Sequence, residues 1–152
     1  MNLIKLINQH HHEIISGAIH RLMEAQFRHY ETEGIEVIEE RYSVLLDRVL
    51  DCISERNLIP ISEYAESIAR ARYESGYPLD EVLSAINLLE EQCWDVIKNY
   101  QYLPEQAQSF GLISKVLGAA KESLSETYVE LASKQGKKSF FISELFGGTA
   151  GV

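Results

Sequence analysis

Apolar residues recur at steps of three and four along most of this chain, and few helix-breaking residues interrupt them. Such spacing places apolar side chains on one side of an α-helix. Three prolines among 152 residues favour a few long helices over many short strands. The sequence therefore predicts an all-α fold. The clearest stripe is formed by Ile35, Ile38, Tyr42, Leu45, Leu46, Val49, Leu50 and Ile53.

Prolines and glycines divide this pattern into a single-domain bundle of about five main helices. Pro60 interrupts the second helix, and Ser62 is the expected cap of the third. Gly76 tolerates the left-handed conformation that ends a helix, and Pro78 opens the next one. The predicted helices run from Leu3 to about Arg28, Ile35 to Ile53, Ser62 to Gly76, Leu79 to about Tyr102, and Phe110 to about Gly136.

The end of the chain differs from the rest. Residues 137–152 combine a dense apolar cluster, from Phe140 to Phe146, with a glycine-rich end. We therefore divide the chain into a helical input domain, residues 1–136, and an apolar tail or junction to a missing output domain, residues 137–152.

The charge of the chain limits its partners. The formal net charge is -9, from 23 acidic and 14 basic side chains, so the surface repels phosphate backbones and anionic lipids. We expect no nucleic-acid or membrane partner. The sequence contains neither an apolar run long enough to cross a bilayer nor a signal-peptide core, which predicts a cytoplasmic location.

Metal and haem sites have little support. All five histidines precede residue 30, so a mid-chain haem ligand is missing, although a globin-like shape without haem remains an alternative. Side chains of the consecutive His10, His11 and His12 diverge on a helix. The best-spaced pairs are His10 with Glu13 and His20 with Glu24.

Cys52 and Cys93 have no neighbouring cysteine and are expected to be buried thiols. We predict no metal and no cofactor.

Sequence motifs for catalysis are also missing. The chain contains no HExxH, no Glu-x-x-His tetrapeptide, no GxSxG elbow and no phosphate-binding glycine loop. The adjacent acid pairs Glu39, Glu40 and Glu90, Glu91 diverge on a helix and suit an outer face. We therefore predict that this protein is not an enzyme, with no catalytic residues.

Aromatic residues near the third and fourth helices are the best candidates for a ligand pocket. The candidates are Tyr73, just before the Gly76-Tyr77-Pro78 corner, Tyr77 within it, and Trp94 after it. Aromatic side chains with a polar group suit a small-molecule site. The alternative is that they only pack in the core, as aromatic stripes at helical spacing commonly do.

The segment from Ile68 to Trp94 carries a family resemblance. A short helix ends in Arg-x-x-x-Gly-Tyr-Pro-Leu-x-Glu-Val-Leu, and a long helix follows with a tryptophan. This pattern resembles the N-terminal domain of RsbRD-type stressosome co-antagonists, a domain also found ahead of bacterial histidine kinases. It covers this junction well and residues 14–131 loosely.

The resemblance implies a helical sensory domain that dimerises and passes a signal to an output module, either a kinase or a stressosome protein. The chain is then a piece of a longer protein or signals by contact. Apolar residues outside the main stripes also favour a homodimer: Ile4, Ile7, Val37 and Val116. Two alternatives remain: a stand-alone protein-binding adaptor and a helical protein that binds a small ligand.

Overall fold

The computed structural model describes residues 2–146, with side chains described for residues 2–135. Residues 2–146 form helices and no strand, which confirms the predicted all-α bundle. The helices are α1 (Leu3–Gln9), α2 (His11–Glu24), α3 (Arg28–Glu31), α4 (Ile35–Glu55), α5 (Ile59–Glu74), α6 (Leu79–Tyr100) and α7 (Leu103–Phe146).

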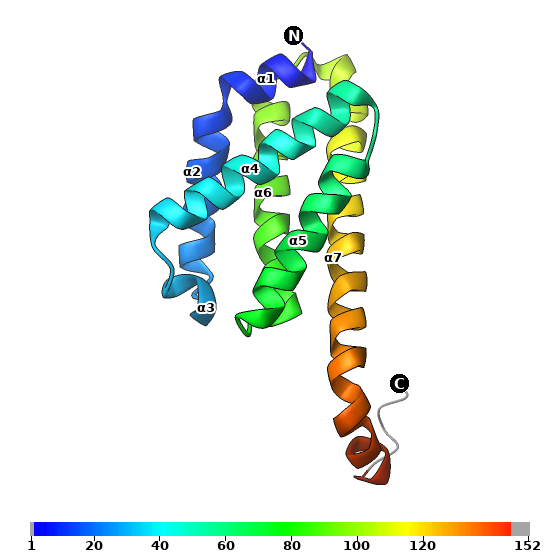
Figure 1. The fold of residues 1–152 in the computed structure, drawn as a ribbon. Coiled ribbons are helices and arrows are strands. Elements are labelled where there is room, and N and C mark those ends of the chain that lie inside the picture. Colours follow the sequence, from blue (N-terminus) through cyan, green and yellow to red (C-terminus); the bar gives the residue numbers. More distant parts are fainter. Residues whose placement is uncertain (1, 147–152) are drawn as a thin grey trace.

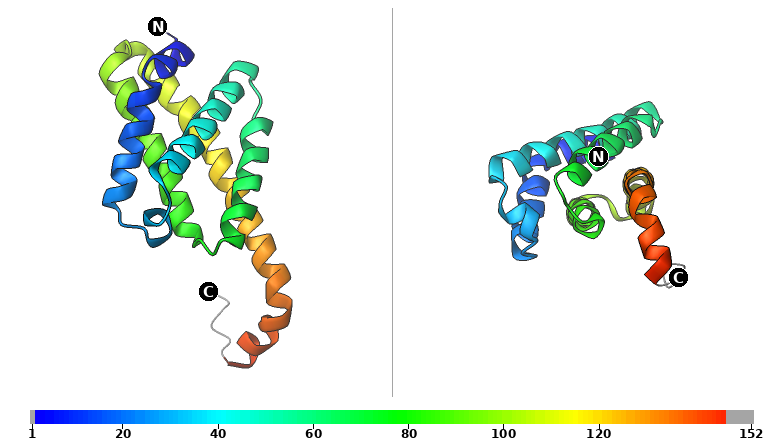
Figure 2. Two further views of the ribbon diagram at one scale, coloured as in Figure 1. Left: turned by 60° about the vertical axis from the view of Figure 1, so that its left-hand side comes forward. Right: turned by 60° about the horizontal axis from the view of Figure 1, so that its bottom comes forward.

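Helix α6 lies in the middle of the bundle (Figure 1). Helix α2 packs on α6, α5 packs on α7, and α7 returns antiparallel to α6. Helix α4 crosses the bundle, and its Tyr42 hydroxyl donates a hydrogen bond to the carbonyl of Ala85 in α6 (2.8 Å). Figure 2 shows the second part of α7 extending away from the other helices. One end of the bundle is thus continued by a projecting helix.

A single hydrophobic core joins all the helices except for this projection. The apolar stripes predicted for the long helices face it, and both Cys52 and Cys93 are buried free thiols as expected. Burial of such side chains is the main stabilising contribution in a domain of this size. The largest fully buried side chains are Leu6, Ile7, Ile14, Leu22, Ile38, Leu46, Ile61, Leu89, Ile97, Ile113, Leu117 and Leu124.

The first predicted helix is divided in the structure. His10 leaves helical geometry (φ -107°, ψ 18°), and α2 then ends at Glu24, before the predicted end at Arg28. The His10 ring stacks on Tyr100 with centroids 4.1 Å apart, and its Nδ1 lies 2.8 Å from a Glu13 carboxylate oxygen. The long-range stacking on Tyr100 and the local contact with Glu13 accompany the break in an otherwise continuous helical pattern. The break lets α1 cover the far end of the bundle while α2 runs along α6.

Two helix starts were predicted too late. Helix α5 begins at Ile59, with Pro60 in its first turn, and Asn57 accepts a hydrogen bond from the Ile59 amide (3.0 Å). Ser62 therefore lies inside the helix and is not its cap. Helix α7 likewise begins at Leu103, ahead of Pro104. Proline is tolerated in a first turn because the amides there have no partner within the helix.

The predicted helix end at Gly136 is also wrong, because the backbone of α7 continues to Phe146. A single glycine in a helix costs only about 1 kcal/mol and need not end it. The division into residues 1–136 and 137–152 stays a prediction, and the glycine-rich residues 147–152 lie outside the described part.

Two of the four residues that favoured a dimer are in fact core residues. Ile7 and Val116 are buried, and Ile4 is partly buried against the core. Of the four residues, only Val37, with 43% of its surface exposed, is accessible for a contact between two copies of the chain.

Candidate functional site

The Gly76-Tyr77-Pro78 corner joins α5 to α6, as predicted. Gly76 has a φ of +82° and its amide donates to the Tyr73 carbonyl (3.1 Å), while the Tyr77 amide donates to the Arg72 carbonyl (2.9 Å). This pair of bonds is a Schellman motif, which needs a left-handed residue after the helix. A glycine adopts that conformation without strain. The predicted role of Gly76 as a left-handed helix end is confirmed.

Tyr77 connects three parts of the bundle at this corner. Its side chain is buried, and its hydroxyl donates to a Glu33 carboxylate oxygen (2.6 Å) in the segment between α3 and α4. Its carbonyl accepts a hydrogen bond from the Tyr128 hydroxyl of α7 (2.9 Å). The Tyr30 ring meets the Tyr77 ring edge-on at 5.0 Å. Tyr77 therefore links α7 to the helices on the other side of the corner.

The structure brings two of the three predicted pocket residues together. Tyr73 packs edge-on against Tyr128 (5.5 Å), and its hydroxyl donates to the Gln135 side chain. Tyr73 therefore contacts α7 through its side chain, and Tyr77 contacts α7 through its backbone carbonyl. Trp94 lies four to five turns further along α6, about 25 Å away at 1.5 Å per residue, and 38% of its surface is exposed.

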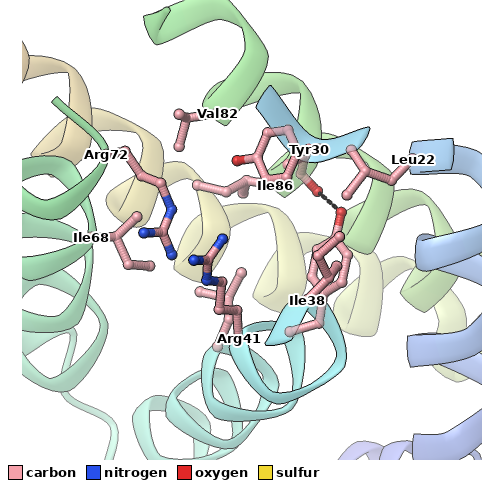
Figure 3. A pocket seen from close by; sticks show the side chains of 11 residues that line it. Leu22, Tyr30, Ile38, Arg41, Ile68, Arg72, Val82 and Ile86 are labelled. Carbon is pink, nitrogen blue, oxygen red and sulfur yellow. Dashed lines mark hydrogen bonds between the residues drawn. The ribbon is translucent and has the colours of Figure 1, made fainter. Parts of the chain in front are cut away.

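A cavity of about 40 Å³ lies beside the corner. Apolar side chains from α2, α4, α5 and α6 form most of its wall, and two arginines, Arg41 of α4 and Arg72 of α5, enter it from neighbouring helices. Figure 3 shows the two guanidinium groups close to each other and facing the same space. The lining residues are Leu22, Tyr30, Ile38, Arg41, Tyr42, Leu45, Ile68, Arg72, Val82, Ala85 and Ile86.

The two arginines are only partly neutralised. Arg41 Nη2 donates to a Glu33 carboxylate oxygen (3.2 Å), whereas its Nη1 is buried without a hydrogen-bond partner among the described residues. Burial lowers the pKa of Arg41, but its interactions with the Tyr77 hydroxyl and with Glu33 outweigh this effect and raise the pKa. Arg72 lies 5.5 Å over the Tyr77 ring and forms no ion pair with the described residues. One carboxylate therefore faces two cations.

Burial and hydrogen bonding set the protonation of the acidic groups around these cations. The hydrogen bond from Tyr77 holds the pKa of Glu33 below its usual range, and the hydrogen bond from Arg41 lowers it further. Burial raises the pKa of Tyr77, and its bond to Glu33 adds to this effect. Burial also raises the pKa of Tyr30 in the cavity wall. At neutral pH, Glu33 is an anion and both tyrosines are protonated.

Sequence analysis did not single out Arg41 or Arg72 as site residues. Arg72 is the arginine of the Arg-x-x-x-Gly-Tyr-Pro pattern, so it was visible in the sequence without a role. Arg41 stands three residues after Ile38 and four before Leu45, on the buried face of α4. A cation within an apolar stripe is the signal that could have identified it.

Comparison with known proteins decides the family. The family model described as the RsbT co-antagonist protein rsbRD N-terminal domain matches residues 13–135. The chain belongs to this family. The match includes the corner, both arginines and the buried part of α7. No curated protein and no solved structure matches the chain.

The family is a regulatory one, in agreement with the predicted resemblance. Within residues 2–135, no group of three or more His, Cys, Asp or Glu side chains is arranged to hold a metal ion. The pairs singled out from the sequence are each close, with His10 2.8 Å from Glu13 and His20 2.9 Å from Glu24. No helix in the described part is both long and apolar enough to span a membrane.

Proposed function

We propose that this chain is a non-enzymatic input domain of a bacterial signalling protein, of the stress-response or two-component type. It acts in the cytoplasm, as a homodimer, through helix-mediated contact with an output module. Membership of the RsbT co-antagonist family supports a regulatory role. A stressosome protein or an output kinase is the proposed partner.

The observation that carries this proposal is the course of α7. The helix has 44 residues, about 66 Å at 1.5 Å per residue. Its first part is buried against α5 and α6, and its last buried residue is Tyr128. None of residues 129–135 is buried, and the helix continues beyond the other helices in Figure 1. A helix that continues out of a folded body is a direct way to transmit a change in that body.

The projecting part of α7 also offers a surface for the proposed dimer and output contacts. Val129 has 62% of its surface exposed, directly after the point where Tyr128 fixes the helix to the corner. An exposed apolar side chain at the point where a helix leaves the bundle suits a contact between helices.

A pair of matched substitutions tests this proposal. Val129→Glu and Val37→Glu both place a charge on an exposed helical valine, the first on α7 and the second on α4. We expect Val129→Glu to weaken self-association in light scattering and binding to a purified stressosome protein or output kinase. Val37→Glu, on α4, should leave partner binding unchanged. A monomer at high micromolar concentration, or loss of partner binding only in Val37→Glu, would contradict transmission through α7.

One specific observation favours the alternative of small-ligand binding. The cavity beside the corner has a mostly apolar wall with Arg41 and Arg72 among its lining residues, and a mostly apolar cavity with a few polar groups is the usual form of a ligand site. This alternative is compatible with an input domain, because a ligand is one kind of signal.

A further inference from the structure

The outer face of α6 and α7 carries four exposed charged side chains that have no ion-pair partner within residues 2–135. Lys98 lies on α6, whereas Lys115, Glu122 and Glu126 lie on α7. In Figure 2, α4 and α5 lie on one side of α6 and α7, and no helix of residues 2–146 covers the other side. The outer face is therefore open to a partner.

The α7 part of the outer face forms one stripe along the helix. Lys115, Gly118 and Glu122 follow one another at steps of three and four residues, which places them on the same side. Val129, with 62% of its surface exposed, follows seven residues after Glu122 and continues the stripe. A β-carbon at Gly118 would meet no atom within 4 Å, so the space beside the middle of the stripe is open.

Trp94 of α6 lies beside this stripe. Asn87, Glu90 and Trp94 are three and four residues apart on one side of α6, and the first two accept hydrogen bonds from Lys121 of α7 (2.9 and 2.8 Å). Because α6 and α7 are antiparallel, Trp94 lies near the level of Gly118. The tryptophan has 38% of its surface exposed. Tryptophan is a frequent anchor of protein interfaces.

The two ends of the outer face have opposite charge. Lys98 and Lys115 lie nearer the turn between α6 and α7, whereas Glu122 and Glu126 lie nearer the corner. Two copies packed in the same direction would place like charges against each other. Two copies packed in opposite directions about Gly118 place Lys115 of each copy opposite Glu122 of the other. Because a chain with a net charge of -9 repels its own copies, such matching favours the opposite direction.

We propose that the outer face, from Lys98 and Trp94 to Val129, binds the same face of a second copy with the two α7 helices antiparallel. The contact is isologous, so it closes as a two-fold dimer. Trp94 of each copy then lies near Gly118 of the other. The inference rests on the proposed function, in which the chain is a homodimer, and adds the surface and its direction.

The antiparallel direction determines where the projecting parts of α7 leave the dimer. Each projecting part passes the turn between α6 and α7 of the other copy, and the two leave at opposite ends. Ser133 lies 15 residues beyond Gly118, so the two Ser133 positions are about 45 Å apart at about 1.5 Å per residue. In a parallel pair, only the roughly 10 Å between helix axes would separate them.

Charge reversals in the full chain test the pairing. Lys115→Glu places two glutamates opposite each other at both pairs of the dimer, and Glu122→Lys does the same with lysines. Each variant should weaken self-association about tenfold or more in analytical ultracentrifugation. The matched control is Glu63→Lys, an exposed glutamate of α5 outside this face, which should associate like the parent.

Mixing the two variants protects the test against simple misfolding. In an equimolar mixture of Lys115→Glu and Glu122→Lys, every pair between unlike copies is again opposite in charge. The mixture, and the double variant by itself, should therefore associate like the parent. A misfolded variant would not be rescued in this way.

Fluorescence and a distance measurement report the geometry of the contact. Trp94 is the only tryptophan, so its emission should shift to shorter wavelength as the parent associates at rising concentration, but not in Lys115→Glu. Spin labels on Ser133→Cys should lie about 45 Å apart in the dimer. Cys52 and Cys93 are buried and should stay unlabelled.

Equal association of the parent, Lys115→Glu and Glu122→Lys would overturn the inference. So would a mixture that fails to associate, or labels closer than about 20 Å. If Val129→Glu weakens association and output binding while the charge reversals do not, this face fails and the proposed function stands. If the charge reversals act as expected and Val129→Glu leaves output binding unchanged, the face stands and transmission through α7 fails.

Discussion

The two ends of this bundle are closed in different ways. At the end covered by α1, apolar side chains such as Leu6, Ile7 and Ile97 are fully buried. At the corner end, the closing contacts are polar or charged: Glu33 bonds to Tyr77 and Arg41, and Tyr128 bonds to the corner backbone. Apolar packing has one good arrangement, whereas polar groups can exchange partners. The corner end is therefore the part of the domain suited to switching.

The largest expected effect lies at the apolar end. Leu6→Ala would leave a cavity under α1 and should lower the free energy of unfolding by about 2 to 5 kcal/mol. Leu103→Ala is a matched control at the same end, because Leu103 is 75% exposed, and it should change stability by less than about 0.5 kcal/mol. Denaturant unfolding measures both. Similar values for the two variants would mean that α1 does not close the core.

Backbone strain at the corner should have the next largest effect. A β-carbon at Gly76 would meet no atom within 4 Å, so the cost of Gly76→Val arises from its φ of +82° alone. We expect a loss of about 1 to 2 kcal/mol and a melting temperature several degrees lower. Gly111→Val is the control, because Gly111 is helical with open space beside it. Melting of Gly76→Val within a degree of the parent would contradict the left-handed helix end.

A smaller effect is expected where α7 leaves the bundle. Tyr128→Phe removes the hydroxyl that donates to the Tyr77 carbonyl and should cost about 1 kcal/mol, since the carbonyl loses its partner. Amide exchange should rise in α7 after residue 128. Tyr100→Phe, at a tyrosine 53% exposed, should alter neither stability nor exchange. Unchanged exchange in Tyr128→Phe would show that this bond does not hold the helix.

The contrast between the ends also explains which features were predictable from sequence. Helical periodicity identified the buried stripes of α4 and α6, and the Gly76 helix end followed from glycine geometry. The break at His10 depends on stacking against Tyr100, 90 residues later in the chain, which no local pattern reports. The meeting of Arg41 and Arg72 depends likewise on how α4 packs against α5. Local rules identify elements, and long-range packing decides the site.

The smallest effect concerns the pH dependence of the polar end. The Tyr77 hydrogen bond, with a further contribution from Arg41, lowers the pKa of Glu33 in the folded state. A carboxyl with a lowered pKa stabilises the fold above its unfolded value of 4.5, and that contribution is lost as the pH falls through the folded pKa.

The parent should therefore lose more stability below pH 4.5 than Glu33→Gln, which has no carboxyl to protonate at this position. The free energy of unfolding of each protein is measured at neutral and at acidic pH. Subtracting the change seen in Glu33→Gln from the change seen in the parent removes the contribution of the other acidic residues. Glu130→Gln is the control, since Glu130 is exposed and pairs only with Lys134 one turn along α7 (3.0 Å). Because exposed helix pairs contribute little, this variant should follow the parent closely. Parallel acid curves for the parent and Glu33→Gln would show that Glu33 is not engaged at the corner.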